Sequence, residues 1–222
     1  MIDTIKTKSA FTLAEVLITL VIIGIVAALT VSAVINTYVE RSTISKVKKG
    51  LSTIAQAKKL AEAQNGSIIG WDFGSGATAE TAAQFWSYLK PHLSVARDCG
   101  ANTDCYINDG VYYLNRSNHT YNFNDSFFYR FVLNDSGVML FRMGETGKCS
   151  YSHGGFNNVC AVFYYDVNGN KKPNTLGRDI FLYDFTADGV FPYKYDSRCN
   201  KSSFGSSCSG YIIQHNNMNY LH

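Results

Sequence analysis

The chain has 222 residues, of which 46% are hydrophobic and 17% are charged, and its formal net charge at pH 7 is +3. This composition excludes an intrinsically disordered chain, which would combine few apolar residues with a high net charge. The basic residues are scattered along the sequence, so the charge gives no indication of a nucleic-acid-binding surface.

The first two segments are a short basic leader and a long apolar run. Residues 1–10 carry Lys6 and Lys8, and residues 11–35 contain Glu15 as their only ionisable side chain. A helix over residues 11–35 is about 37 Å long at 1.5 Å per residue. Since the hydrocarbon core of a bilayer is about 30 Å thick, the pattern predicts a leader peptide followed by a transmembrane helix.

A secretory signal peptide is an alternative interpretation of the same stretch. The leader has the positive charge of an n-region, and Val31-Ser32-Ala33 has the small residues of a cleavage site. The apolar run is longer than the roughly 7–15 residues of a usual h-region, and a carboxylate near its start is unusual. We therefore expect the run to remain attached as a membrane anchor.

The residues around the junction of leader and anchor have a specific resemblance. The segment Ala10-Phe11-Thr12-Leu13-Ala14-Glu15-Val16-Leu17-Ile18 resembles the N-terminal motif of type IV pilins and type II secretion pseudopilins. The resemblance implies that a prepilin peptidase cuts between Ala10 and Phe11 and methylates the new amino terminus. The family usually has Gly before the cut, and this chain has Ala10, so we expect slower processing.

The resemblance identifies Glu15 as the glutamate of the family. A carboxylate in hydrocarbon neutralises or finds a cation, and the Phe11 ammonium of a neighbouring subunit would supply one. Such a pair would set the register between subunits in a helical filament. The alternative is that Glu15 lies near the membrane edge and reaches the lipid headgroups.

The helix is expected to continue past the membrane as an amphipathic stem over residues 36–65. Its apolar residues fall at helical spacing, and Asn65-Gly66 is a typical helix end. Basic residues beyond the anchor outnumber those of the leader, which by the positive-inside rule would leave the following domain in the cytoplasm. Long domains translocate largely regardless of charge, so we expect export.

The cysteines also favour a location outside the cytoplasm. None of the six forms a C-x-x-C pair, so a zinc site is poorly supported, and an even number in a Gly- and Asn-rich domain favours disulfides. Fifteen pairings are possible, and we expect the nearest neighbours to pair. The expected bonds are Cys99–Cys105, Cys149–Cys160 and Cys199–Cys208.

Residues 66–222 are long enough to form one disulfide-stapled extracytoplasmic head domain. We expect a helix over Ala79–Lys90, which Pro91 ends, and then β-prone runs separated by turn residues. The predicted strands are Phe127–Leu133, Val138–Met143, Val159–Val167, Asp179–Phe185 and Val190–Tyr193. The predicted fold class is α+β, with a long N-terminal helix (a transmembrane half plus an amphipathic half) packed on an antiparallel β-sheet head.

One loop of the head is a candidate calcium site. Asp166, Asn168 and Asn170 present oxygen ligands around Gly169, as at the start of a calcium-binding loop, and Asp179 would complete the set. No bidentate Glu follows at the EF-hand spacing, and two lysines lower the local negative charge. Asx and Gly residues are also typical of hydrogen-bonded turns, so a purely structural loop is the alternative.

The sequence gives no catalytic site. The five histidines are scattered without metal-binding spacing, and no nucleophile elbow or phosphate-binding glycine loop is present. We expect a structural subunit of a type IV pilus or type II secretion pseudopilus, with prepilin peptidase, other pilin subunits and the inner membrane as partners. The alternative is a secreted or membrane-anchored extracytoplasmic binding or adhesion module, with calcium as its candidate ligand.

Overall fold

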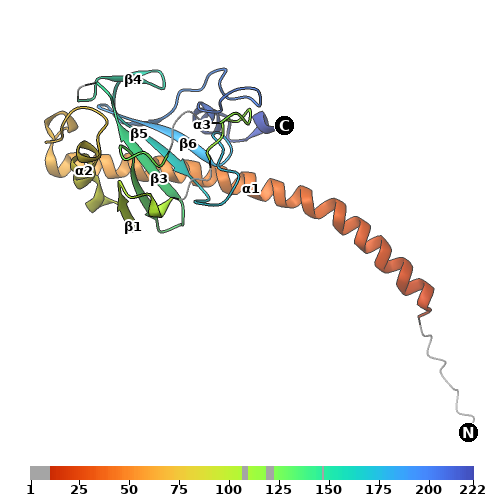
Figure 1. The fold of residues 1–222 in the computed structure, drawn as a ribbon. Helices are drawn as coiled ribbons and strands as arrows, with labels where there is room; N and C mark the ends of the chain where they lie inside the picture. The colour runs from red at the N-terminus through yellow and green to blue at the C-terminus, as the bar shows by residue number, and fades with distance from the viewer. Residues whose placement is uncertain (1–10, 107–109, 119–122, 147) are drawn as a thin grey trace, which may run out of the picture. The chain divides into compact units, whose positions relative to one another are not determined.

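The fold was examined in a computed structural model that describes residues 11–106, 110–118, 123–146 and 148–222. The described chain divides into two compact units, with the boundary between Arg41 and Ser42. The leader over residues 1–10, including Ala10, lies outside the described residues. Figure 1 shows the helices and strands.

The first element is the helix α1, which covers Leu13–Asn65. Its apolar N-terminal part makes it the one helix in the described ranges that is long and apolar enough to cross a membrane. The helix ends where Gly66 adopts a positive φ of 76° and donates its N–H to the carbonyl oxygen of Glu62, 2.9 Å away. This left-handed C-terminal residue is the helix end that Asn65-Gly66 predicted.

The head contains an antiparallel sheet with the strand order β1-β2-β3-β5-β6-β7, and β4 pairs with β5. The strands are β1 Val95–Gly100, β2 Tyr129–Leu133, β3 Val138–Met143, β4 Tyr151–His153, β5 Phe156–Asp166, β6 Ile180–Thr186 and β7 Val190–Pro192. The other helices are α2 Ala79–Leu89, α3 Cys208–His215, and four short 3-10 helices at Ile68–Gly70, Lys90–His92, Thr103–Cys105 and Asn219–Leu221. The α+β class is confirmed, with the long helix followed by an antiparallel sheet and three disulfides.

The β2–β3 hairpin follows directly from its turn residues. Ser136 has a positive φ of 68°, and Leu133 donates its N–H to the carbonyl oxygen of Gly137 at 2.9 Å. The Asp135 carboxylate accepts the N–H of Gly137 at 3.2 Å, the local bond that makes Asp frequent in turns. The hairpin therefore forms where the sequence predicted it.

One face of the sheet packs on the C-terminal part of α1, which Figure 1 shows running along the strands β3, β5 and β6. Val47 and Ile54 of the helix are fully buried, and the hydroxyl of Tyr183 donates to the carbonyl oxygen of Val47 at 2.7 Å. At Gly50 an added Cβ would lie 2.7 Å from the ring of Tyr165, so only glycine permits this close approach.

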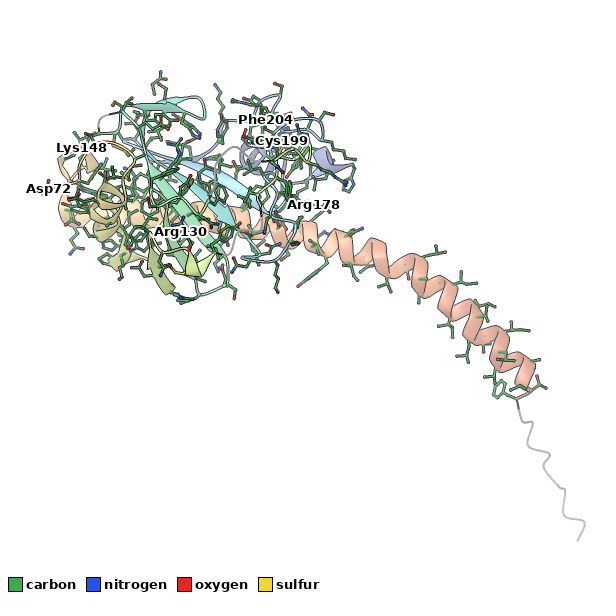
Figure 2. The ribbon with its side chains drawn as sticks, viewed as in Figure 1. Asp72, Arg130, Lys148, Arg178, Cys199 and Phe204 are labelled. Atoms are coloured by element: carbon green, nitrogen blue, oxygen red, sulfur yellow. A yellow bond between two sulfur atoms is a disulfide. The ribbon has the colours of Figure 1, made fainter. Side chains whose placement is uncertain are left out.

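The opposite face of the sheet is covered by loops. Arg130 is fully buried and donates to the carbonyl oxygens of Ala101 and Phe128 at 3.0 and 2.8 Å, and to those of Phe123 and Asp125. Figure 2 labels this side chain within the head. Because the guanidinium joins segments that lack regular structure, it supplies hydrogen bonds that a strand or helix would otherwise provide.

Both faces of the central strands are therefore buried, which explains their composition. The strands β3 and β6 are buried along their whole length instead of alternating between apolar and polar residues. Such runs are typical of strands that are covered on two sides.

Lys58 interrupts the apolar stripe of the stem, and the structure shows how it is accommodated. Its side chain is 3% exposed, and its ammonium group contacts Glu62 at 2.6 Å and the carbonyl oxygen of Ala187 at 3.0 Å. The ammonium also lies 5.9 Å from the ring centroid of Phe185. A buried lysine is tolerated here because its charge is paired and hydrogen-bonded.

Candidate processing and assembly site

The candidate site at the N-terminus is built from Thr12 and Glu15 at the start of α1. Both the N–H and the hydroxyl of Thr12 donate to Oε2 of Glu15 at 2.9 Å, and the hydroxyl accepts the N–H of Glu15 at 3.2 Å. This reciprocal arrangement is a capping box, which satisfies N–H groups that have no partner within the helix. The carboxylate therefore has a local structural role in addition to its predicted role in assembly.

The capping box was missed at the sequence level, although its signal is present. Thr12 precedes Glu15 by three residues, directly before a long apolar run, which is the spacing of a capping box. Only one oxygen of Glu15 is used. Within the described residues Oε1 accepts no hydrogen bond, so this oxygen is available to a donor from another molecule.

The first apolar residues of the segment are exposed. Phe11 is 87% exposed, and Leu13, Leu17 and Leu20 are exposed as well. Apolar side chains in such numbers on a helix surface indicate contact with lipid or with other proteins. Ala10, the predicted residue before the cut, lies outside the described residues, so the structure gives no geometry for the scissile bond.

The six cysteines form the three expected nearest-neighbour disulfides. Cys99 is bonded to Cys105, Cys149 to Cys160, and Cys199 to Cys208. Each bond closes a short segment of the head, and the segment between Cys149 and Cys160 contains β4 and the start of β5.

The candidate calcium loop brings Asp166 and Asp179 close together in the interior. Asp179 accepts the N–H groups of Asn174 and Thr175 at 2.9 and 2.6 Å and the side-chain amide of Asn168 at 3.2 Å. Asp166 accepts the hydroxyl of Tyr106 at 2.8 Å and the N–H of Asn168 at 3.1 Å. These bonds are those of a hydrogen-bonded loop, the alternative considered above.

Asn170, the third predicted oxygen ligand, makes a contact with another loop. It is exposed, and its side-chain amide donates to the carbonyl oxygen of Cys105 at 3.3 Å. Calcium binding by Asp166, Asn168, Asn170 and Asp179 stays a prediction.

The electrostatics of the loop differ from those of an ordinary turn. Burial and the neighbouring Asp179 raise the pKa of Asp166 to about 8, and burial also raises the pKa of Asp179. In addition, the buried side-chain oxygens of Asn168 and Asn174 accept no hydrogen bond from the described residues. Two buried carboxylates and two unpaired amide oxygens form a region that would be stabilised by a positive charge.

Other metal or catalytic groupings are not found in the part of the chain that the structure describes. No group of three or more His, Cys, Asp or Glu residues there is placed to hold a metal ion. His153 lies 2.5 Å from the buried Asp184, an internal pair of the head.

The comparisons with known proteins agree with the N-terminal site. Residues 5–31 match the family described as the prokaryotic N-terminal methylation motif, which is typical of type IV pilins and pseudopilins. No curated protein and no solved structure was found to match the chain. The match includes Phe11 and Glu15 and does not extend to the head, so any role of the head is argued from its own residues.

Proposed function

We propose that the chain is a prepilin-like structural subunit, cut before Phe11 and N-methylated by a prepilin peptidase, that assembles into a type IV pilus or a type II secretion pseudopilus. The observation that carries the proposal is the methylation motif over residues 5–31, combined with an apolar helix and a disulfide-bonded antiparallel head. Proteins with this motif are typically structural subunits. The protein would be anchored in the inner membrane with the head outside the cytoplasm before it enters the filament.

The geometry of Glu15 supports a double role in this proposal. Its Oε2 caps the first turn of α1, while its Oε1 remains available for the methylated ammonium of Phe11 from a neighbouring subunit. Such a pair would bring together opposite charges in a medium of low dielectric constant, where an unpaired charge is costly. One carboxylate would then fix both the helix start and the subunit register.

Mass spectrometry of the mature N-terminus tests the proposal. We expect an N-methylated Phe11 in cells that contain the peptidase and an uncut chain in cells that lack it. Ala10→Gly serves as the matched variant, and faster processing is expected because Gly is the usual residue of the motif. A chain that starts at Met1 or at Val34 in the presence of the peptidase would rule the proposal out.

A second candidate function, calcium binding by the head, is favoured by the loop over residues 166–179. The loop holds two unpaired amide oxygens and two buried carboxylates, of which Asp179 is already influenced by the charge of Arg178. Calcium takes carboxylate and amide oxygens as ligands. This function would suit a binding or adhesion module and is also compatible with a filament subunit.

Calorimetric titration of the full chain in detergent with calcium tests whether the loop binds this ion. Binding of calcium is expected for the native protein and not for Asp166→Ala. Asp72→Ala, which removes an exposed carboxylate, is the matched control and should bind like the native chain. The absence of heat with the native protein would leave the hydrogen-bonded loop as the only role of these residues.

A further inference from the structure

Three loops that are far apart in the sequence meet at one end of the head. Residues 110–118, 171–179 and 196–208 are joined by backbone hydrogen bonds, such as Leu114 to Phe204 at 3.1 Å and Leu176 to Tyr112 at 2.9 Å. Figure 2 shows Arg178, Cys199 and Phe204 at this end. The meeting of these loops brings together, at one end of the head, basic residues that lie far apart in the sequence.

The three loops have a strong excess of positive charge. They contain six Lys and Arg residues and two Asp residues, a net charge of +4, whereas the rest of residues 66–222 carries six basic and eleven acidic residues, a net charge of −5. Of the two Asp residues, Asp179 is buried and Asp196 is paired with Arg198. The exposed basic residues without an ion pair among the described residues are Arg116, Lys171, Lys172, Arg178 and Lys201.

An exposed aromatic ring lies among these charges. Phe204 is 49% exposed, although its ring packs against Tyr113 at a centroid distance of 4.5 Å. We call the five basic residues and Phe204 the cationic end. An exposed apolar side chain on the same loops as several basic residues is a surface suited to contact a partner of opposite charge.

A complementary surface occurs on the same head. Residues 60–89 contain no Lys or Arg, and among their three acidic residues Glu62 is paired with Lys58. Asp72 and Glu80 are exposed and make no ion pair with the described residues, and the nearby Ile69 is 55% exposed. One exposed base, Lys148, lies beside them and donates to the carbonyl oxygen of Trp71, so the two carboxylates outnumber the lysine on this side (Figure 2). We call Ile69, Asp72 and Glu80 the acidic end.

The two ends lie on opposite sides of the head. Figure 2 shows Asp72 at one side of the head and Arg178 and Phe204 at the other. A contact between these surfaces can therefore form only between two molecules. It would also leave one free surface of each kind, to which further copies can be added.

We propose that the heads of neighbouring subunits contact each other end to end, with the cationic end of one copy on the acidic end of the next. The inference rests on the proposed filament function and names the surface by which the heads take part. The partner is a second copy because the acidic surface that complements the cationic end, with its own exposed apolar residue, is present on the same chain. Such a heterologous contact does not close and so produces an open filament.

Charge reversal on each end tests the proposal in cells that assemble the native chain. Arg116→Glu with Lys201→Glu should reduce incorporation into filaments at least tenfold, and Asp72→Lys with Glu80→Lys should do the same. The chain that carries all four changes has the native net charge and both ends inverted. It should regain incorporation to within about threefold of the native level, because opposite charges again face each other.

The matched control reverses two exposed basic residues outside the cationic end. Lys59→Glu with Arg97→Glu changes the net charge as much as the first variant does, and incorporation should stay within about twofold of the native level. An equal loss of incorporation in this control would show that the change in net charge causes the effect, and it would overturn the proposal. Thermal unfolding of each variant separates a loss of contact from a loss of folding.

Carbodiimide crosslinking of the full chain in membranes gives a direct readout. The reagent joins a lysine amine to a carboxylate as an amide, and the reagent takes up the water that is lost. We expect a crosslink between Lys201 and Asp72 or Glu80, and mixed isotope labelling should show that it joins two copies. If crosslinks between copies form only at other positions, the end-to-end contact is contradicted.

The outcomes also separate this proposal from the proposed function. If Glu15→Ala prevents assembly while all charge reversals assemble normally, the chain is a filament subunit and the end-to-end contact is wrong. If reversal of the cationic end cannot be rescued by reversal of the acidic end, the cationic end serves another partner, such as a nucleic acid. If the native chain is neither cut before Phe11 nor assembled, the proposed function itself fails.

Discussion

The apolar side chains of the N-terminal segment and of the head have opposite surroundings. Leu20 and Ile25 of α1 are exposed, whereas Phe141 and Phe163 of the sheet are fully buried among other aromatic rings. The head satisfies its apolar surface within its own unit, and residues 11–31 have no such cover in the structure. The difference teaches that the head is specified by internal packing, whereas the apolar surface of the N-terminal segment needs cover from outside the segment, which the proposed function assigns to lipid and other copies of the chain.

Glu15 of the N-terminal segment and Asp166 of the head also differ in their surroundings. Glu15 is exposed and is bonded only within the first helical turn, while Asp166 is buried with Tyr106 and the loop backbone. Changes in the N-terminal segment should therefore alter assembly, and changes in the head should alter folding. The following predictions test this division in order of decreasing effect.

The largest effect is expected for Glu15→Ala. In the proposed filament Glu15 is one member of a buried ion pair, and removing one such member costs about 3–5 kcal/mol, so incorporation into filaments should fall by at least about 100-fold. Membrane insertion and the thermal unfolding of the head should not change. The measurement is the ratio of subunit in sheared filaments to subunit in the membrane.

Glu15→Gln separates the two roles of this residue. Glutamine can accept the hydrogen bonds of the capping box without carrying a charge. If the charge of Glu15 sets the register between subunits, the Glu15→Gln variant should fail to assemble, as Glu15→Ala does. Normal assembly of Glu15→Gln would leave helix capping as the only role of this residue.

Phe85→Ala should have the largest effect on folding. Phe85 of α2 is fully buried and contacts the rings of Trp71, Phe73, Phe141 and Phe185. Its removal should lower the free energy of unfolding by about 3–5 kcal/mol, as measured with denaturant. Leu20→Ala, a truncation in the exposed segment, is the control and should leave the unfolding of the head unchanged.

The stability of the head should also depend on pH through Asp166. The pKa of this carboxyl is about 8 in the folded state, against an ordinary value of 3.8. Between these values only the folded state holds the proton, so stability should fall as the pH rises from about 4 to about 8, by up to ~1.4 kcal/mol per unit. Denaturant unfolding in metal-free buffer measures this slope.

One substitution and the addition of calcium sharpen the pH prediction. Asp166→Asn should flatten the pH dependence, because no proton is then bound on folding at this position. Added calcium should raise the stability of the native chain near pH 8 if the loop holds a cation, and it should leave Asp166→Asn unchanged. An unaltered slope in the Asn variant would assign the pH dependence to other groups.

The smallest effect is expected at the helix caps. The hydroxyl of Thr78 accepts the N–H of Thr81 at 3.1 Å at the start of α2, so Thr78→Ala should cost the head about 1 kcal/mol. Thr12→Ala removes the corresponding cap of α1 and should leave the unfolding of the head unchanged. A change in head stability in the Thr12 variant would show that the two regions are not independent.

Local signals were sufficient for much of the fold. The helix end at Asn65, the hairpin around Asp135 and the strand before Val167 were predicted from turn residues and apolar runs, which act over a few residues. The disulfides followed from sequence proximity. The capping box was readable from Thr12 and Glu15 but was overlooked.

Other features depend on contacts between distant segments. The strand β1 has mostly exposed residues and register shifts against β2, so it lacks the alternation that identifies a strand. The helix α3 has eight residues and depends on a close approach of Gly210 to the backbone of Tyr193. The cationic end is likewise formed only when three loops meet.

The contact at Gly50 has a mechanical consequence. The ring of Tyr165 occupies the space that a side chain at position 50 would need, and the adjacent residues Lys49 and Leu51 both carry side chains. A shift of the helix by one residue, about 1.5 Å, would bring one of these side chains against the ring. A pull along this part of α1 would therefore load the sheet in shear instead of sliding the helix over it.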